Sequence, residues 1–394
     1  MKTSSTTIQQ RLEQRLARYV AMPTVSSDAT ACKEAIQTIT AELNTLGFKT
    51  TVHQSNHPWV MATTRDTKHV RVLLHAHFDV VMANSDEQYS LRTEEDKLYG
   101  RGVLDMKFAL ACYMEALTDL LQQDELSAYD LGVLVTTDEE LGGEHGVKEF
   151  LDQGWTCDIA IIPDGGRDFK IEKRAKGFHL LYLDSHGTST HGSRPWEGVN
   201  PLPKLLPAVL EIMGHYKNDQ PDLPTVSING IDTPSSFTQV GDLARARIDV
   251  RAFEDNELLA VEDHIKDIAD KFGLTMTRHL EGSAVHLDES NPLVQTFIQC
   301  QSKVLGKPTE FVESLAASDA RYFAAHNIPT ILEYIHGGGH HSKNEWILRS
   351  SLVQFYEVIW VYIQEAALDR AGQPIGRRLF GAPKKVMRNL LNRS

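Results

Sequence analysis

The sequence predicts an α/β fold with a doubly wound, mostly parallel central sheet and an inserted α+β domain. Four short, nearly continuous apolar runs indicate strands covered on both faces, and they begin at Val70, Leu131, Ile159 and Pro329. Helical stretches lie between them, and such an alternation of strand and helix is typical of a parallel sheet with helices on both faces. Between residues 176 and 287 the runs instead alternate apolar and polar residues, as half-exposed antiparallel strands do.

Helices of the main domain are predicted where apolar residues recur at helical spacing. These stretches are 8–22, 31–47 (closing on Gly47), 106–123, and 318–327 with Ser318 as a candidate N-cap. The inserted part has two alternating runs, 179–187 and 244–253, and two helical stretches, 201–216 and 258–273. We therefore expect a main domain formed by residues 1–175 and 288–369, an inserted domain at 176–287 and a basic tail at 370–394.

Composition narrows the class of protein. The chain has 394 residues and a formal net charge of −13, which argues against a nucleic-acid-binding surface and leaves carboxylates available for metals. The cysteines form no C-x-x-C pair, so neither a disulfide framework nor a thiolate zinc site is indicated. The first residues lack a signal peptide and no apolar run is long enough for a membrane span, so we expect a cytoplasmic protein.

The C-terminal tail is basic and amphipathic. No acidic residue follows Asp369, whereas arginines and lysines accumulate there beside apolar side chains. A frayed terminus is the expected explanation, since chain ends are commonly disordered. Contact with an anionic membrane surface or with a partner is the alternative.

Imidazole and carboxylate groups follow each of the four predicted strands. The endings hold, in chain order, His75, His77 and Asp79; then Asp138, Glu139 and Glu140; then Asp164; and finally His340, His341 and Glu345. Ligands of such sheets bind beyond the carboxyl ends of the strands, so we expect these groups to converge in one crevice. For the adjacent pair Glu139 and Glu140 alone, a solvated turn would be the ordinary explanation.

A convergent set of acids and imidazoles indicates a metal site. Such groups would repel one another and be poorly solvated unless a cation neutralised them. Imidazole and carboxylate ligands without thiolates suit zinc, manganese or cobalt. One catalytic zinc needs three protein ligands, so the larger number of candidates indicates two ions that share a carboxylate. Asp105, just before the helix that starts near Met106, is the candidate bridge, with a helix N-cap as the alternative.

Five ordered motifs then resemble a known family. HAHFDVV, YGRGVLDMK, TTDEELGG, PDGG and HHSKNE are similar to the metal-site motifs of the M20 metallopeptidases, the group of acetylornithine deacetylase, succinyl-diaminopimelate desuccinylase, aminoacylase, carboxypeptidase G2 and the carnosine dipeptidases. The resemblance covers roughly residues 8–366. It implies a zinc-peptidase catalytic domain interrupted by a lid domain that commonly also serves for dimerisation, so a homodimer is expected.

Carried over by position, the resemblance implies the roles of single residues. One metal would be held by His77, Asp105 and Asp164, the other by Asp105, Glu140 and His341, with Glu139 as the general base and Asp79 orienting the His77 imidazole. It also implies a cis peptide bond between Asp105 and Met106. His340 is additional to the family pattern, and His341 is preferred as the ligand because its spacing to Glu345 fits.

The inserted domain carries further implied site residues. GTSTHGSRPWEGVNP is similar to a family stretch, which implies that His191 reaches a neighbouring subunit's site and stabilises the oxyanion, and that Asn200 contacts substrate. Arg321 resembles the position near which relatives bind a substrate's acidic end; a surface ion pair with Asp319 or Glu333 is the alternative. The chain departs from the family at 238–241, where many relatives have N-x-I-P.

These observations predict a dinuclear metal-dependent hydrolase that cleaves the amide bond of a small N-acyl amino acid or short peptide. The nucleophile would be a metal-bridging water, and the cofactors two divalent ions, zinc in the first place with cobalt or manganese as alternatives. A non-catalytic relative that binds metal and amino-acid derivatives is the competing hypothesis, although such a relative would not need Glu139. A phosphoesterase is disfavoured because no phosphate cradle accompanies the ligands.

Overall fold

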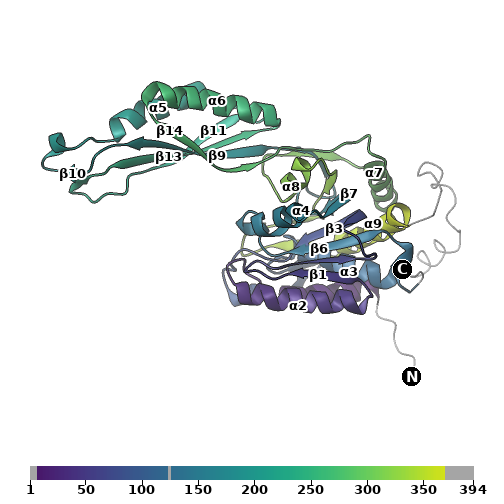
Figure 1. The fold of residues 1–394 in the computed structure, drawn as a ribbon. Coiled ribbons are helices and arrows are strands. Elements are labelled where there is room, and N and C mark those ends of the chain that lie inside the picture. The colour runs from purple at the N-terminus through teal and green to yellow at the C-terminus, as the bar shows by residue number, and fades with distance from the viewer. Residues whose placement is uncertain (1–6, 123–125, 369–394) are drawn as a thin grey trace. The chain divides into compact units, whose positions relative to one another are not determined.

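The computed structural model of the chain describes residues 7–122 and 126–368 (Figure 1). The basic tail at 370–394 lies outside these residues. The chain divides into two compact units. The first unit comprises the residues up to 169, 288–310 and those from 333 onward, and the second comprises 170–287 and 311–332. Residues 311–332, which the sequence predicts to belong to the main domain, group instead with the inserted part, to which their first strand is paired.

The sheet of the first unit has parallel strands at its centre. Its strands are β1 (Lys49–His53), β2 (Trp59–Thr63), β3 (His69–His77), β6 (Leu131–Thr136) and β7 (Thr156–Ile162), in the order β1-β2-β6-β3-β7. β3 runs parallel to both β6 and β7, while β2 runs antiparallel to β1 and β6. The predicted mixed α/β fold with a mostly parallel sheet is thereby confirmed, although β1 and β2 were not predicted.

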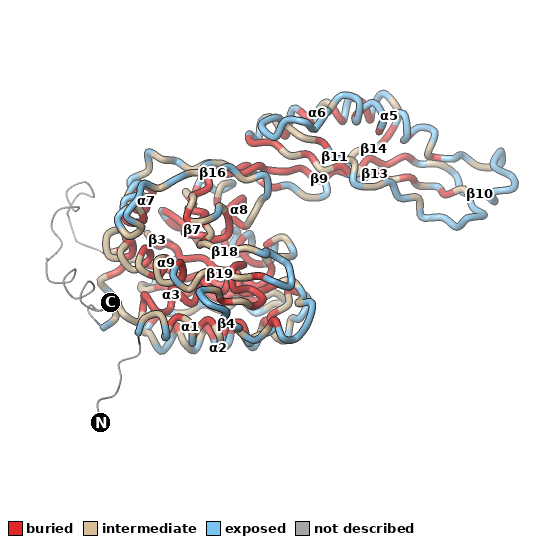
Figure 2. Tube along the Cα trace, turned by 180° about the vertical axis from the view of Figure 1, so that it is seen from behind, coloured by how far each residue is buried: buried red, intermediate tan, exposed pale blue. Residues whose placement is uncertain are grey.

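Helices flank this sheet, and their starts follow from their capping residues. The long ones are α1 (Ile8–Val20), α2 (Ala29–Thr45), α3 (Lys107–Leu120), α7 (Pro292–Leu305) and α9 (Arg349–Tyr362). The side chains of Thr7, Asp28 and Asn291 cap α1, α2 and α7, each accepting a backbone N–H of the first turn. Nearly every residue of α3 is buried, and Figure 2 shows the central strands buried as well. This core holds the strand ends in place.

Short elements complete the first unit. They are η1 (Asp86–Tyr89), η2 (Leu126–Ala128), η3 (Glu139–Leu141), η4 (Glu144–Lys148), α4 (Glu149–Asp152) and η6 (Ile363–Ala367), with β4 (Arg92–Glu94), β5 (Lys97–Tyr99), β18 (Gly337–Gly338) and β19 (Trp346–Leu348). The four strands form a small sheet in the order β18-β19-β5-β4. Pairing of Trp346 with Tyr99 joins two segments that are distant in sequence. This small sheet therefore ties the loop after β5 to the loop between β18 and β19.

The second unit is built on an antiparallel sheet. β9 (Gly177–His186), β11 (Thr225–Asp232), β13 (Leu243–Ala252) and β14 (Thr275–Gly282) follow the order β11-β13-β9-β14. Helices α5 (Leu202–His215) and α6 (Asp255–Phe272) lie along it (Figure 1), and Leu183, Ile248 and Ile265 belong to their shared core. Alternate residues of β13 are buried, as the alternating sequence predicted.

The remaining elements of the second unit are short. They are β8 (Ile171–Ala175), β10 (Thr190–His191), η5 (Pro195–Glu197), β12 (Gln239–Val240), β15 (Val285–His286), β16 (Phe311–Ser314), α8 (Ala320–Ala325) and β17 (Thr330–Leu332). The strand predicted from Pro329 corresponds to β17. Among the described residues, no helix has both the length and the apolar character that a bilayer crossing requires.

Candidate metal centre

Three neighbouring parallel strands of the first unit end in the predicted acidic and imidazole groups. β3 ends at His77, β6 leads into Glu139 and Glu140, and β7 leads into Asp164. Because β6, β3 and β7 are adjacent and parallel, these ends meet at one edge of the sheet. Asp105 follows β5 at the start of α3, and its peptide bond to Met106 is cis, as the resemblance implied.

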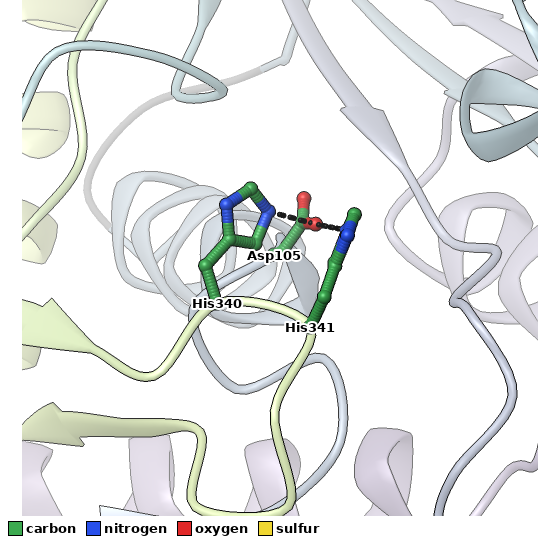
Figure 3. Close-up of side chains that lie close together, drawn as sticks. All are labelled: Asp105, His340 and His341. Carbon is green, nitrogen blue, oxygen red and sulfur yellow. Dashed lines mark hydrogen bonds and ion pairs between the residues drawn. The ribbon is translucent and has the colours of Figure 1, made fainter.

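Asp105 occupies the centre of the cluster. Its Oδ1 lies 2.9 Å from Nε2 of His77, while its Oδ2 lies 2.5 Å from Nε2 of His340 and 3.0 Å from Nε2 of His341. Figure 3 shows the imidazoles of His340 and His341 directed at this carboxylate. The two oxygens of one buried carboxylate thus face different histidines, which is the arrangement that a bridging ligand requires.

His77 shows why these residues fit a cation. Its Nδ1 lies 3.1 Å from the backbone carbonyl oxygen of Asp79, which can only accept, so Nδ1 carries the hydrogen. In a neutral ring Nε2 then presents a lone pair to the Asp105 carboxylate, and two acceptors at hydrogen-bond distance need a proton or a metal ion to hold them together. Burial alone would lower the pKa of His77, but hydrogen bonds with Asp105 and Asp79 outweigh it and hold the pKa well above its usual range.

The adjacent glutamates face different partners. Glu140 Oε2 lies 3.1 Å from Nε2 of His341 and its other oxygen accepts the backbone N–H of Val81 at 3.3 Å. Glu139 instead lies with His77 and Asp164, and these three residues offer ligand atoms within 4.8 Å of one another. The turn itself is held by Asp79, whose carboxylate accepts the backbone N–H groups of Glu139 and Glu140 at 3.3 and 3.2 Å.

Tyr334 is a site residue that the sequence analysis did not single out. Its hydroxyl donates to Asp164 Oδ1 at 2.5 Å and lies 3.4 Å from Asp105 Oδ1. Burial and the neighbouring carboxylates raise the pKa of the phenol well above its usual range, so it stays a proton donor. Its run, PTILEYI, carries only the apolar pattern of a strand, and the one available signal was a polar aromatic residue at the end of that run.

The loop that carries Asp105 is fixed by Glu345. This buried carboxylate accepts the backbone N–H groups of Gly102, Leu104 and Asp105 at 3.0, 2.9 and 3.2 Å, and the guanidinium of Arg101 at 2.8 Å. Arg101 also donates to the backbone carbonyl of the metal-site residue His341 at 3.2 Å. Glu345 and Arg101 therefore hold the Asp105 loop and the His341 loop in one arrangement.

His75, singled out from the sequence together with His77, has a different place. It is fully buried within β3, and its Nε2 lies 3.2 Å from the hydroxyl of Thr136. Burial and the nearby His77 lower the pKa of His75 to about 3, so the imidazole is neutral. It belongs to neither of the two ligand groups found among the described residues.

Three further predicted residues lie in the second unit. His191, on β10, is exposed and its Nδ1 lies 2.7 Å from the hydroxyl of Ser193. Asn200 accepts the backbone N–H of Leu202 at 3.0 Å, at the start of α5. Arg321 is only 5% exposed and donates to the backbone carbonyl of Ser318 at 3.0 Å. Their roles toward substrate stay predictions.

Two ligand groups stand out among the described residues. One comprises Asp105, His340 and His341, and the other His77, Glu139 and Asp164. Hydrogen bonds with Asp105 and Glu140 raise the pKa of His341 to about 10, because these acids favour a positive charge on the imidazole. Imidazole nitrogens and carboxylate oxygens without thiolates form a donor set suited to divalent metals such as zinc.

Comparisons with known proteins identify the family of the chain. The profile of Peptidase family M20/M25/M40 matches residues 73–365. A succinyl-diaminopimelate desuccinylase of Rickettsia bellii is 28% identical over 327 residues, which cover 76% of this chain and 82% of the relative. The structure of aminopeptidase PepT from Bacillus cereus has a TM-score of 0.72 at 17% identity, covering 91% of this chain and 98% of that chain.

A second solved structure gives a similar result. The M20 family metallo-carboxypeptidase Sso-CP2 from Sulfolobus solfataricus has a TM-score of 0.71 at 18% identity, covering 90% of this chain and 98% of that chain. At such identities the likeness concerns the fold. Fold, ligand groups and family profile together define a metal-dependent peptidase or amidohydrolase. The chain belongs to peptidase family M20/M25/M40, and the resemblance found in its motifs is confirmed.

Proposed function

We propose that the chain is a dinuclear metal-dependent hydrolase that cleaves the amide bond of an N-acyl amino acid or a short peptide. The observation that carries this proposal is the Asp105 carboxylate, with Oδ1 facing His77 and Oδ2 facing His340 and His341. A carboxylate that bridges two ions must present its oxygens to two separate sets of ligands, as Asp105 does. A single-ion site would leave one of these two sets without a role.

The family resemblance implies how the ligands divide between the two ions. His77, Asp105 and Asp164 would hold one ion, and Asp105, Glu140 and His341 the other. Zinc is the ion proposed first, because this mixture of imidazole and carboxylate suits it, with cobalt and manganese as alternatives. When bound, two such cations polarise the scissile carbonyl and bring the pKa of water close to neutrality.

The chain's own groups complete the reaction. Glu139 takes the proton of the attacking water and passes it to the nitrogen of the leaving amine, a transfer typical of a positioned carboxylate. Asp79 supports this role because its carboxylate holds the turn and its backbone carbonyl holds His77. Tyr334 keeps Asp164 oriented through its hydroxyl. The cluster would thus supply the metal ligands and the base of the proposed reaction, while stabilisation of the oxyanion is assigned to His191 below.

The proposal extends to the second unit and to the assembly. His191 would stabilise the oxyanion in a neighbouring subunit's site, which makes a homodimer the active form, and Arg321 and Asn200 would contact the substrate. An amino acid or peptide substrate agrees with the names of the relatives, which include a desuccinylase and a tripeptidase. A cytoplasmic location stays a prediction from the sequence. Mixing His191→Ala with a Glu139 variant tests the shared site, because only a shared site restores activity in the mixture.

A matched pair of variants tests the catalytic proposal. Glu139→Gln should lower kcat by about 10²- to 10⁴-fold on the best substrate while metal content stays that of the wild type. Glu144→Gln, on the same segment and exposed, is the control and should change neither. A panel of acetyl-, succinyl- and formyl-amino acids and di- and tripeptides, run with zinc, cobalt and manganese, identifies the substrate. Undiminished turnover in Glu139→Gln would refute the base, and loss of metal would make Glu139 a ligand instead.

A further inference from the structure

Three imidazoles face the Asp105 carboxylate, which is one more than the proposed ligand sets use. His77 lies at Oδ1, and His341 lies at Oδ2 and also reaches Glu140. The third, His340, places its Nε2 only 2.5 Å from Oδ2, closer than His341 does. His340 and His341 therefore face the same carboxylate oxygen.

The backbone of this loop is shaped so that two consecutive histidines face one atom. Neighbouring side chains diverge in an extended segment, yet here the two ring centroids are 4.1 Å apart. Gly339 has φ +73°, and a Cβ there would lie 2.2 Å from the backbone oxygen of Asn344. His341 itself has φ +57°, the left-handed region that non-glycine residues seldom adopt. The local conformation therefore brings both imidazoles to Oδ2.

The surroundings of His340 favour a cation. Asp105 is the one carboxylate paired with His340 among the described residues, and the Tyr334 ring lies edge-on at 5.9 Å. The His340 side chain is 49% exposed, so its nitrogen can reach the cluster and still exchange with solvent. His336, on the same segment, is similarly exposed at 46%, but its Nδ1 is paired with Asp168 at 2.7 Å instead of Asp105.

We propose that His340 is an additional ligand of the ion that Asp105, Glu140 and His341 hold. This inference rests on the proposed dinuclear function. It implies that the two metal ions are held by different numbers of ligands. The His340 position would have two imidazoles and two carboxylates, so that a bridging water would be its fifth ligand, whereas the His77 position has one imidazole and two carboxylates. The nitrogen-rich position should load first, release last and prefer zinc or cobalt over manganese.

The experiment measures metal binding directly. Wild type, His340→Ala, His340→Gln and His336→Ala are stripped with a chelator and titrated with zinc and with cobalt. Bound metal is counted by elemental analysis under competition with a chelator, and the visible spectrum of cobalt reports its ligands. We expect the wild type to bind two ions with different affinities, and His340→Ala to lose at least about 10-fold in affinity at the tighter position. His336→Ala should match the wild type.

The glutamine variant separates a ligand from a hydrogen-bonding partner. Its amide can still donate to Asp105 but is a poor metal ligand, so His340→Gln should bind zinc as weakly as His340→Ala and should show an altered cobalt spectrum. Wild-type affinity and spectrum in both His340 variants, with two ions bound by the wild type, would overturn the inference and leave the dinuclear function standing. Fewer than two ions in the wild type would overturn the proposed function itself.

Discussion

Replacing Glu345 with alanine should lower the stability of the first unit and weaken metal binding at its site. Glu345 is 1% exposed and accepts three backbone N–H groups and the buried guanidinium of Arg101. Leaving a buried charge without its partner costs about 3–5 kcal/mol, and each N–H left unsatisfied adds about 1–3 kcal/mol unless water replaces the carboxylate. The free energy of unfolding should therefore fall by at least about 3 kcal/mol, a large part of the roughly 5–15 kcal/mol typical of a domain.

Urea unfolding in chelator-containing buffer measures this loss, and elemental analysis of the folded protein measures bound metal. Glu345→Gln keeps an acceptor oxygen but loses the charge. Its free energy of unfolding and its metal content should therefore lie between those of the wild type and of Glu345→Ala. Glu94→Ala is the matched control, since Glu94 is exposed and paired with exposed Arg92, and should change stability by less than about 1 kcal/mol. A loss below about 1 kcal/mol in Glu345→Ala, with metal content unchanged, would refute the role given to this carboxylate.

Three further outcomes are expected. Tyr334→Phe removes the hydroxyl from Asp164 and should weaken metal binding by about 10-fold in a zinc titration, whereas Tyr216→Phe should not. Burial raises the pKa of Glu333 well above its usual 4.5. The contribution of neutral Glu333 to folding stability is therefore complete below about pH 4.5. It is lost as the pH rises toward the raised pKa of Glu333 in the folded protein, by up to about 1.4 kcal/mol per pH unit. Glu333→Gln should remove this slope, as urea unfolding at about pH 5 and about pH 8 checks. Metal at about 100 times its Kd should add about 2.7 kcal/mol to the free energy of unfolding, and a thermal scan with and without chelator measures it.

The sequence allowed the strands at the site to be predicted because their residues obey strong local rules. The runs that became β3, β6 and β7 are continuous and apolar, and each is followed by polar groups that a buried turn would not tolerate without a function. β1 was missed because it is a short, half-exposed strand with little apolar contrast. β2 is fully buried, but its apolar run, WVMA, is at the short end of what indicates a strand.

The details of the site depended on geometry that no sequence pattern contains. That Tyr334 reaches Asp164, and that His340 shares an oxygen with His341, follows from how the loop after β17 folds back along β19. His75 and His77 have the same spacing signal as a ligand pair, yet only His77 faces Asp105, while His75 faces the hydroxyl of a neighbouring strand. Periodicity identifies a strand and its end, but it does not say which nitrogen meets which oxygen.

In the proposed reaction Asp105 serves two cations at once. Counting divalent ions per chain in the reconstituted wild type and in Asp105→Asn, with turnover measured on the same samples, tests this most simply. We expect two ions in the wild type, and neither full occupancy nor hydrolysis in the asparagine variant, because an amide cannot replace the charge that both positions share. A wild type saturated by one ion, or an asparagine variant that keeps two ions and normal turnover, would contradict it.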